Sequence, residues 1–317
     1  MKYAILSLTT TALLMTGCNK VATTDANADK NTSTAPVTKP ATEKEVATAK
    51  PAIAPVKPAP PPQPAVEIKT VEELHKALKR VNPSYQNTAE VNPQLTAMSL
   101  SNTFVSDLTP IASMKLMMLD LRGLRINSLE PLVGMPLQEL YLEETQVSDL
   151  LPLKGLQLKK LYLSKSNVTD LSPLAGMPLT ELNLLGTQIV DIAPLRDMPL
   201  TSLWLTECPV SDITALGSCP LVSLTLHRTR VKDLSPLKTV TTLQRLHVGE
   251  TAVTDLSPLL ELPLNRLTFT PAKITAGIDG LRKMGSLQGL ATRFDDGERN
   301  TMPPAEFWEK FDAGKLK

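Results

Sequence analysis

Aromatic side chains are scarce in this chain of 317 residues, where they make up 3%, and histidine and cysteine occur three times each. The 33 basic and 32 acidic residues nearly cancel, so no excess charge points to nucleic acid or to an acidic partner. Because one cysteine lies in the N-terminal segment, the cysteines imply no disulfide framework. The chain is 42% hydrophobic and can form a packed core, and the lack of aromatics indicates a core built on one aliphatic side chain.

The first residues have the pattern of a targeting signal. Lys2 precedes an apolar run, AILSLTTTALLM, which is too short and too polar to span a membrane as a helix. The run ends in LLMTGC and resembles a bacterial lipoprotein signal, in which the cysteine becomes the first residue and carries the lipid. This resemblance implies a signal peptide over residues 1–18, lipidation of Cys18 and an anchor in the cell envelope, with Asn19 favouring the outer membrane. The alternative is an ordinary cleaved signal with an incidental cysteine.

Residues 19–66 have the composition of a linker. They contain no aromatic residue and nine prolines, and they end in PAPPPQP. Such a segment cannot bury enough apolar surface to offset its chain entropy, so we expect it to be disordered. At about 3 Å per residue it has a reach on the order of 100 Å. It is either a tether that holds the folded part away from a membrane or simply a disordered connection.

A repeated motif dominates the remaining sequence. The 21 residues LKKLYLSKSNVTDLSPLAGMP, from Leu158, are followed directly by LTELNLLGTQIVDIAPLRDMP. A fixed period of this length predicts a solenoid, in which each repeat buries its apolar side against its neighbours. The nine copies begin at Leu95, Leu116, Leu137, Leu158, Leu179, Leu200, Leu221, Leu243 and Leu264, and a degenerate copy begins at Leu287.

The fixed positions of the repeat each have a structural reason. The opening L-x-x-L-x-L alternates as in a strand with one buried face, which leaves its x positions toward solvent. The ninth position is mostly Thr, whose hydroxyl can bond the backbone of the following turn, and the eleventh is Val or Ile for the core. The thirteenth is Asp in seven of nine copies, before an L-S-P-L corner. Asp can cap the free amides of a helical corner, and Pro is tolerated in its first turn.

This pattern resembles the leucine-rich repeat family, in particular the short T-x-V-x-D-L-S-P-L repeats of internalins and many bacterial cell-envelope proteins. The resemblance covers residues 95–290 and implies an α/β fold: a leucine-rich repeat solenoid, or horseshoe, with a parallel concave β-sheet and short helical corners on the convex side.

Helical caps are expected at both ends of the repeats. In the N-terminal cap, residues 67–94, a capping box from Thr70 to Glu73 opens the helix VEELHKALKRV. In the C-terminal cap, residues 291–317, a helix begins at Pro303-Pro304 and carries FWEKF. Its aromatic residues are expected to cover the last repeats, and a partner-binding helix is the alternative.

The residues that vary between repeats predict a binding surface on the concave face. The fifth position holds Tyr141, Tyr162 and Trp204, which are three of only six Tyr and Trp residues in the chain. Tyr, Trp and Arg are enriched at binding hot spots, although aromatic residues also pack well across strands without any partner. The predicted partner-binding residues are Tyr141, Tyr162, Leu185, Trp204, His227, Arg228, Arg245 and His247.

Neither catalysis nor metal binding is expected. The chain contains no GxGxxG, phosphate-binding loop, HExxH, CxxC or GxSxG motif, and the segments that flank the repeats are too short for a catalytic domain. His227 and His247 lie on adjacent strands, but the neighbouring positions supply no third metal ligand, and no cofactor is implied. Cys208 and Cys219 are expected to be small core residues, and a disulfide between them stays open.

Two functions fit these observations. The first is a membrane-tethered, non-enzymatic module of the cell envelope that binds a protein or peptide through its concave face. The second is a structural or adhesive surface or spacer protein without a discrete ligand site. The sequence leaves open the identity of the partner and whether the protein faces the periplasm or the outside. A monomer is expected, because the last strand would offer a dimer edge only if its cap failed.

Overall fold

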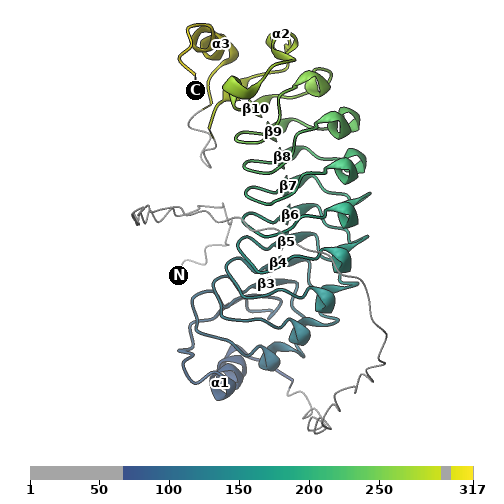
Figure 1. Ribbon diagram of the computed structural model, residues 1–317. Coiled ribbons are helices and arrows are strands. Elements are labelled where there is room, and N and C mark those ends of the chain that lie inside the picture. Colours follow the sequence, from purple (N-terminus) through teal and green to yellow (C-terminus); the bar gives the residue numbers. More distant parts are fainter. Residues whose placement is uncertain (1–66, 294–300, 317) are drawn as a thin grey trace, which may run out of the picture. The chain divides into compact units, whose positions relative to one another are not determined.

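The described residues form one sheet of eleven strands, which follow the order of the sequence (Figure 1). The repeats supply ten of these strands, and the first strand precedes them. The computed structural model describes residues 67–293 and 301–316, so the predicted signal peptide, Cys18 and the linker lie outside the described residues. The strands are β1 (Glu90–Val91), β2 (Ala97–Ser99), β3 (Met118–Asp120), β4 (Glu139–Tyr141), β5 (Lys160–Tyr162), β6 (Glu181–Asn183), β7 (Ser202–Trp204), β8 (Ser223–Thr225), β9 (Arg245–His247), β10 (Arg266–Thr268) and β11 (Gly289–Ala291).

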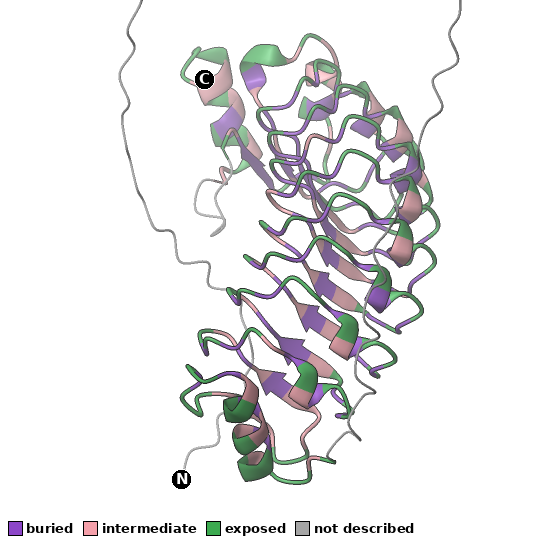
Figure 2. Ribbon diagram, turned by 60° about the horizontal axis from the view of Figure 1, so that its bottom comes forward, coloured by how far each residue is buried: buried purple, intermediate pink, exposed green. Residues whose placement is uncertain are grey.

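Strands β2 to β11 pair in parallel and keep one register, which confirms the predicted stack. Each strand covers the third to fifth positions of a repeat, and equivalent residues lie opposite each other from strand to strand. The central residue of each strand, such as Leu161 or Leu182, is fully buried. Figure 2 shows the buried residues in purple along the strands. Since a strand alternates its side chains, the third and fifth positions then lie on the other face of the sheet.

The ninth-position Thr closes the turn after the strand, as predicted. The Thr145 hydroxyl donates a hydrogen bond to the Leu142 carbonyl at 2.8 Å, and Thr187 bonds Leu184 in the same way at 2.7 Å. The threonine side chains are buried in both turns. A backbone carbonyl that the turn removes from water is thus satisfied within each repeat.

One-turn 3-10 helices form the corners opposite the sheet. In the seven copies that carry Asp at position thirteen, the carboxylate accepts a hydrogen bond of 2.8 Å from the backbone amide of the second residue after it. Asp170, for example, accepts this bond from the Ser172 amide. This confirms the capping role, and no cluster of acidic, His or Cys side chains within the described ranges could hold a metal ion. The corners are η1 (Thr109–Ile111), η2 (Glu130–Leu132), η3 (Leu151–Leu153), η4 (Ser172–Leu174), η5 (Ala193–Leu195), η6 (Thr214–Ser218), η7 (Ser235–Thr239) and η8 (Ser257–Leu259), whereas η9 (Pro271–Lys273) lies in the turn that follows β10.

Removing one of these caps should weaken the stack measurably. We expect Asp191→Ala to lower the free energy of unfolding by about 1 kcal/mol, because the Ala193 amide loses its 2.8 Å acceptor. Asp191→Asn keeps an acceptor and should lose less. Urea unfolding at pH 7 measures both, and equal losses would show that the hydrogen bond is not what the aspartate contributes.

The N-terminal end of the sheet contains one predicted and one unpredicted element. Helix α1 (Val71–Val81) begins with the predicted capping box, in which Thr70 accepts from the Glu73 amide and Glu73 accepts from the Thr70 amide. Strand β1 was not predicted, and it pairs with β2 in the antiparallel direction. It is only two residues long and follows from the turn at Asn92, whose side chain accepts from the amides of Thr96 and Ala97.

The C-terminal end is closed by two short helices. Helix α2 (Ile278–Arg282) replaces a corner, and the degenerate copy supplies β11. Helix α3 (Pro304–Asp312) buries Phe307 fully, with its ring 5.5 Å from that of Phe269, so this part of the helix covers the last repeats as predicted. The backbone amides of Leu290 on β11 and of Met302 each donate a hydrogen bond to the carbonyl of the other residue. This pair covers part of the last edge of the sheet. None of the described helices is long and apolar enough to cross a membrane.

Candidate functional site

Three aromatic side chains form a row on the concave face, the sheet surface made by the third, fifth and seventh positions of the repeats. Tyr141 on β4 and Tyr162 on β5 lie opposite each other, with ring centroids 5.0 Å apart and planes inclined by 20°. Trp204 on β7 has its ring centroid 6.2 Å from that of Tyr162. All three side chains are half-buried, so this aromatic row keeps part of its surface open to solvent.

Charged residues at the third position fix the two tyrosines. The Tyr141 hydroxyl donates to Glu139 at 3.0 Å, and the Tyr162 hydroxyl donates to Glu181 at 2.6 Å. Lys160 lies between these two carboxylates, with its Nζ atom 3.6 Å from each. Burial and the neighbouring carboxylates raise the pKa of both tyrosines, so both hydroxyls stay protonated and continue to donate. The row is therefore held in place before any ligand arrives.

A second polar group borders the row on its N-terminal side. Asp120, which is buried, accepts two hydrogen bonds from Arg122, at 2.9 Å from Nε and 2.7 Å from a terminal nitrogen. The Arg122 guanidinium lies 5.7 Å from the centre of the Tyr141 ring, within the range of a cation–π contact. Beside them, burial raises the pKa of Glu143 from 4.5 to about 7, and its Oε2 atom has no hydrogen-bond partner among the described residues.

Neutralising Glu143 should stabilise the protein at high pH. The raised pKa means that the folded state keeps a proton that the unfolded state releases above pH 4.5, so stability falls as pH rises from about 4.5 to 7. At about 1.4 kcal/mol for each pH unit, the loss reaches about 3 kcal/mol. Glu143→Gln should recover it at pH 8 and change little at pH 4. Urea midpoints at the two pH values measure this, and an equal change at both would contradict it.

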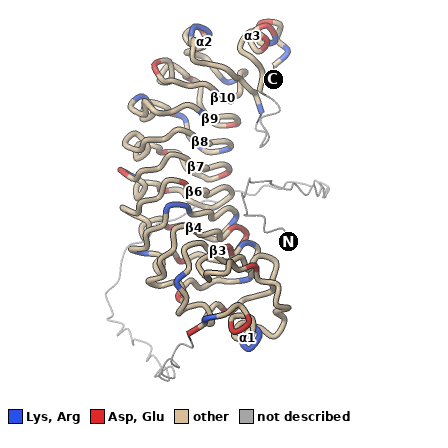
Figure 3. Tube along the Cα trace, turned by 180° about the vertical axis from the view of Figure 1, so that it is seen from behind, with Lys and Arg blue, Asp and Glu red and all other residues tan. Residues whose placement is uncertain are grey.

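The loop edge of the concave face carries a ladder of alternating charges. Eighth-position residues follow the strands in the left-handed region, including Glu207 at φ 62°, Arg228 at 55° and Glu250 at 56°. Arg228 bonds both neighbouring glutamates at 2.9 Å, and Figure 3 shows these loop tips alternating red, blue and red. Arg228 thus lies on the loop edge rather than in the strand columns. Gly123 and Gly186 occupy the eighth position in other repeats. Because glycine adopts positive φ readily, these residues could have indicated from the sequence that this position is left-handed.

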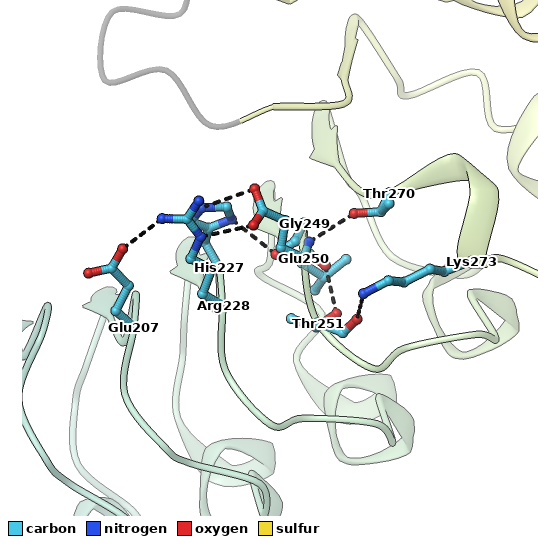
Figure 4. A network of polar contacts seen from close by, with 9 residues as sticks. Glu207, His227, Arg228, Gly249, Glu250, Thr251, Thr270 and Lys273 are labelled. Carbon is cyan, nitrogen blue, oxygen red and sulfur yellow. Dashed lines mark hydrogen bonds and ion pairs between the residues drawn. The ribbon is translucent and has the colours of Figure 1, made fainter. Parts of the chain in front are cut away.

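His227 and His247 are brought together, but they are buried rather than turned to solvent as their positions predict. Each has 7% of its surface exposed, and their ring centroids lie 4.9 Å apart. Figure 4 shows His227 beside Gly249 and Glu250. His227 Nδ1 lies 3.0 Å from the Gly249 carbonyl oxygen, and a Cβ on Gly249 would come within 3.3 Å of the His247 ring. The missing side chain of Gly249 therefore makes room for the pair. Burial, with a smaller contribution from His227, lowers the pKa of His247 to about 3.

The remaining predicted residues border this surface in different ways. Leu185 is half-buried after β6, between the strands of Tyr162 and Trp204. Arg245 is exposed on β9 and lines a hollow with His247. The structure also places Glu139 and Glu181 against the tyrosines, although they were not among the predicted partner-binding residues. Residues two positions apart in a strand lie on the same face, so the sequence could have placed these third-position glutamates beside the fifth-position tyrosines.

The two cysteines of the repeats are free and buried. Cys208 takes the place of the ninth-position Thr, and its thiol lies 3.0 Å from the Leu184 carbonyl. Cys219 lies 3.3 Å from the Leu195 carbonyl. Each thiol thus has its own backbone acceptor, as expected for small core residues.

Comparison with known proteins identifies the architecture. No protein-family model and no curated protein matches the chain. Among solved structures, an internalin (inlF) from Listeria monocytogenes is 27% identical with a TM-score of 0.60, covering 69% of this chain and 68% of its own. Internalin C2 (inlC2) from the same organism is 29% identical with a TM-score of 0.56, covering 62% of this chain and 92% of its own. The chain therefore has a leucine-rich repeat solenoid fold with a parallel concave sheet and short helical corners.

Proposed function

We propose that this protein is a non-enzymatic module that binds a protein or peptide on its concave face. The observation that carries the proposal is the aromatic row of Tyr141, Tyr162 and Trp204, which is partly open to solvent and fixed by Glu139 and Glu181. Large aromatic surfaces that are already ordered bind with a small further loss of side-chain entropy. An extended sheet face of this kind suits a macromolecular partner.

The polar groups around the row favour a partner that is recognised in detail rather than by apolar contact alone. The Asp120–Arg122 pair lies at one end of the row, and the exposed Arg245 on β9 lies beyond the other. The hollow at the C-terminal end of the face has a volume of about 140 Å³. Small-molecule sites usually enclose about 300–1,000 Å³, so the hollow fits one side chain of a larger ligand better than a whole metabolite.

A pull-down from envelope extract tests the proposal. The full chain is cross-linked to its partners beside two double variants, Tyr162→Ala with Trp204→Ala and Leu151→Ala with Val190→Ala. The second pair removes apolar surface that is about 60% exposed off the concave face. We expect a partner that the wild type and the second variant capture and the first loses. The same partners captured by all three would contradict binding on the concave face and favour a structural or spacer role.

The location of the protein is part of the same proposal. A lipid on Cys18 would anchor it in the envelope, with the outer membrane favoured by Asn19, and residues 19–66 would connect the anchor to the repeats. We expect Cys18→Ser to abolish incorporation of radiolabelled palmitate and to move the protein from the membrane to the soluble fraction. Labelling that persists in Cys18→Ser would contradict the anchor.

A further inference from the structure

The aromatic row lies where the concave face carries its negative charge. Among the described residues, every carboxylate at a third, fifth or seventh position belongs to the repeats of β3 to β6. The basic residues at these positions of the same repeats are Arg122 and Lys160, and the carboxylates are those of Asp120, Glu139, Glu143 and Glu181. This part of the face is therefore acidic, and charge complementarity favours a basic group of the partner beside the row.

The basic residues of these repeats balance the carboxylates only in part. The Lys160 ammonium is shared between Glu139 and Glu181, since its Nζ atom lies 3.6 Å from each carboxylate. Arg122 forms its ion pair with Asp120. Glu143 forms no ion pair with a described residue, and its Oε2 atom accepts no hydrogen bond from one. A further cation would thus meet an excess of negative charge here.

The chain itself shows twice how it holds a guanidinium. The Arg122 guanidinium donates two hydrogen bonds to a carboxylate and lies 5.7 Å from the centre of the Tyr141 ring. At the C-terminal cap, Arg282 donates to Asp312 at 3.0 Å and lies 4.8 Å from the centre of the Trp308 ring. In both places a carboxylate accepts the hydrogen bonds, and an aromatic ring lies within the range of a cation–π contact.

Tyr162, Trp204 and Glu181 offer the same two kinds of partner without a guanidinium. The Tyr162 hydroxyl donates to Glu181, which lies opposite Ser202, two residues before Trp204 on the same face. No arginine or lysine among the described residues lies over the Tyr162 or Trp204 ring. A carboxylate can accept about four hydrogen bonds, and Glu181 has one hydrogen bond and one ion pair. The three side chains are half-buried, so a ligand can reach their outer surface.

We infer that these three residues form an arginine subsite, in which a guanidinium of the partner lies against the Tyr162 and Trp204 rings and donates hydrogen bonds to Glu181. The inference rests on the proposed function and adds the chemistry of the ligand. Arginine suits the subsite better than lysine, because a guanidinium is planar, stacks on aromatic rings and is more weakly hydrated than an ammonium. Partial burial strengthens the contact, since water and salt screen a half-buried charge less than an exposed one.

Proton–nitrogen NMR of the full chain tests the subsite. The chain has two tryptophans, so the indole N–H signals report Trp204 and Trp308 separately, and Trp204→Phe assigns them. The probe is N-acetyl-arginine amide, and N-acetyl-citrulline amide is its control, because citrulline has nearly the same shape without the charge. We expect the arginine probe to shift the Trp204 signal saturably and the citrulline probe to leave it unchanged. Equal shifts with both probes, or no shift with the arginine probe, would overturn the inference.

A pair of matched variants separates the subsite from long-range charge. Glu181→Gln loses the carboxylate charge but keeps an oxygen that can accept from Tyr162, and it should weaken binding of the arginine probe about fivefold or more. Glu130→Gln removes the same charge at an exposed corner and should weaken binding less than about twofold. Equal weakening in both variants would overturn the inference. Thermal unfolding of each variant confirms that it is folded.

A third probe, N-acetyl-lysine amide, defines the chemistry of the cation. It carries the same charge as the arginine probe but has no planar group with paired donors, so we expect it to bind more weakly. Binding of the lysine probe that is as tight as that of the arginine probe would contradict recognition of a guanidinium.

The subsite and the proposed function fail in different ways. If Tyr162→Ala with Trp204→Ala loses the captured partner but the arginine probe does not shift the Trp204 signal of the wild type, the concave face binds a partner and the subsite is wrong. If binding of the arginine probe depends on Glu181 but the aromatic variant keeps its partner, the subsite exists and the proposed role of the aromatic row is wrong.

Discussion

Replacing Leu182 by Ala will lower the free energy of unfolding by about 3–5 kcal/mol. Leu182 is the central residue of β6 and is fully buried, in register with Leu161 and Leu203 on the neighbouring strands. Removing its side chain loses the transfer free energy of the missing carbons and leaves a cavity that two repeats must share. In a solenoid each repeat packs only against its neighbours, so such damage interrupts the chain of contacts at its middle. Urea unfolding measures the loss.

The matched control for Leu182 is an apolar residue that the stack does not bury. Val190, which is 59% exposed in the following loop, should lose less than about 0.5 kcal/mol on replacement by Ala. A loss at Leu182 no larger than the loss at Val190 would mean that the leucine columns do not hold the repeats together.

Lowering the pH from 7 to 4 will destabilise the protein through His247 by about 3 kcal/mol. Burial holds its folded pKa at about 3, below the ordinary value of 6.5. The unfolded chain therefore takes up a proton below pH 6.5 that the folded chain refuses, and stability falls from pH 6.5 down to about 3. Each pH unit in this window contributes about 1.4 kcal/mol. His227 faces His247 directly and adds repulsion to any proton gained.

The variant His247→Gln isolates this contribution. The glutamine has no proton to gain. The unfolding free energy of the wild type should therefore fall relative to that of the variant as the pH is lowered from 7 to 4. Comparing the difference at each pH matters because the capping aspartates titrate as well. Hydrogen bonds from Ser172, for example, lower the pKa of Asp170, so its stabilisation is lost only as the pH falls below the ordinary range of Asp. A difference that does not change with pH would contradict a buried neutral His247.

The architecture was predictable because one sequence period sets it. Leucines at the fourth position had to face one side of a strand, and the structure buries Leu161 and Leu182 at the centre of β5 and β6. Asp before the corner was expected to accept hydrogen bonds from the free amides there, and it does so at the same distance in each repeat. These predictions used only contacts within a repeat or between identical positions of neighbouring repeats. The fold therefore followed from local rules applied many times.

The parts that escaped prediction depend on what differs between neighbouring repeats. The burial of His227 and His247 follows from their packing together and from Gly249 beside them, which no single repeat specifies. The environment of Glu143 likewise depends on residues of the preceding repeat, Asp120 and Arg122. Strand β1 is too short to have a pattern of its own. The aromatic row was predicted as a column, but the carboxylates that orient its hydroxyls belong to another column.

Hydroxyl-radical footprinting of the complex with the captured partner tests most directly whether the concave face is the binding surface. Oxidation is read for each side chain by mass spectrometry, with and without the partner. We expect Tyr141, Tyr162 and Trp204 to lose most of their reactivity in the complex. Val133 and Leu151, about 60% exposed on the corner side, should keep theirs. Protection of these corner residues with an unchanged aromatic row would instead place the binding surface on the convex side and rule out binding on the concave face.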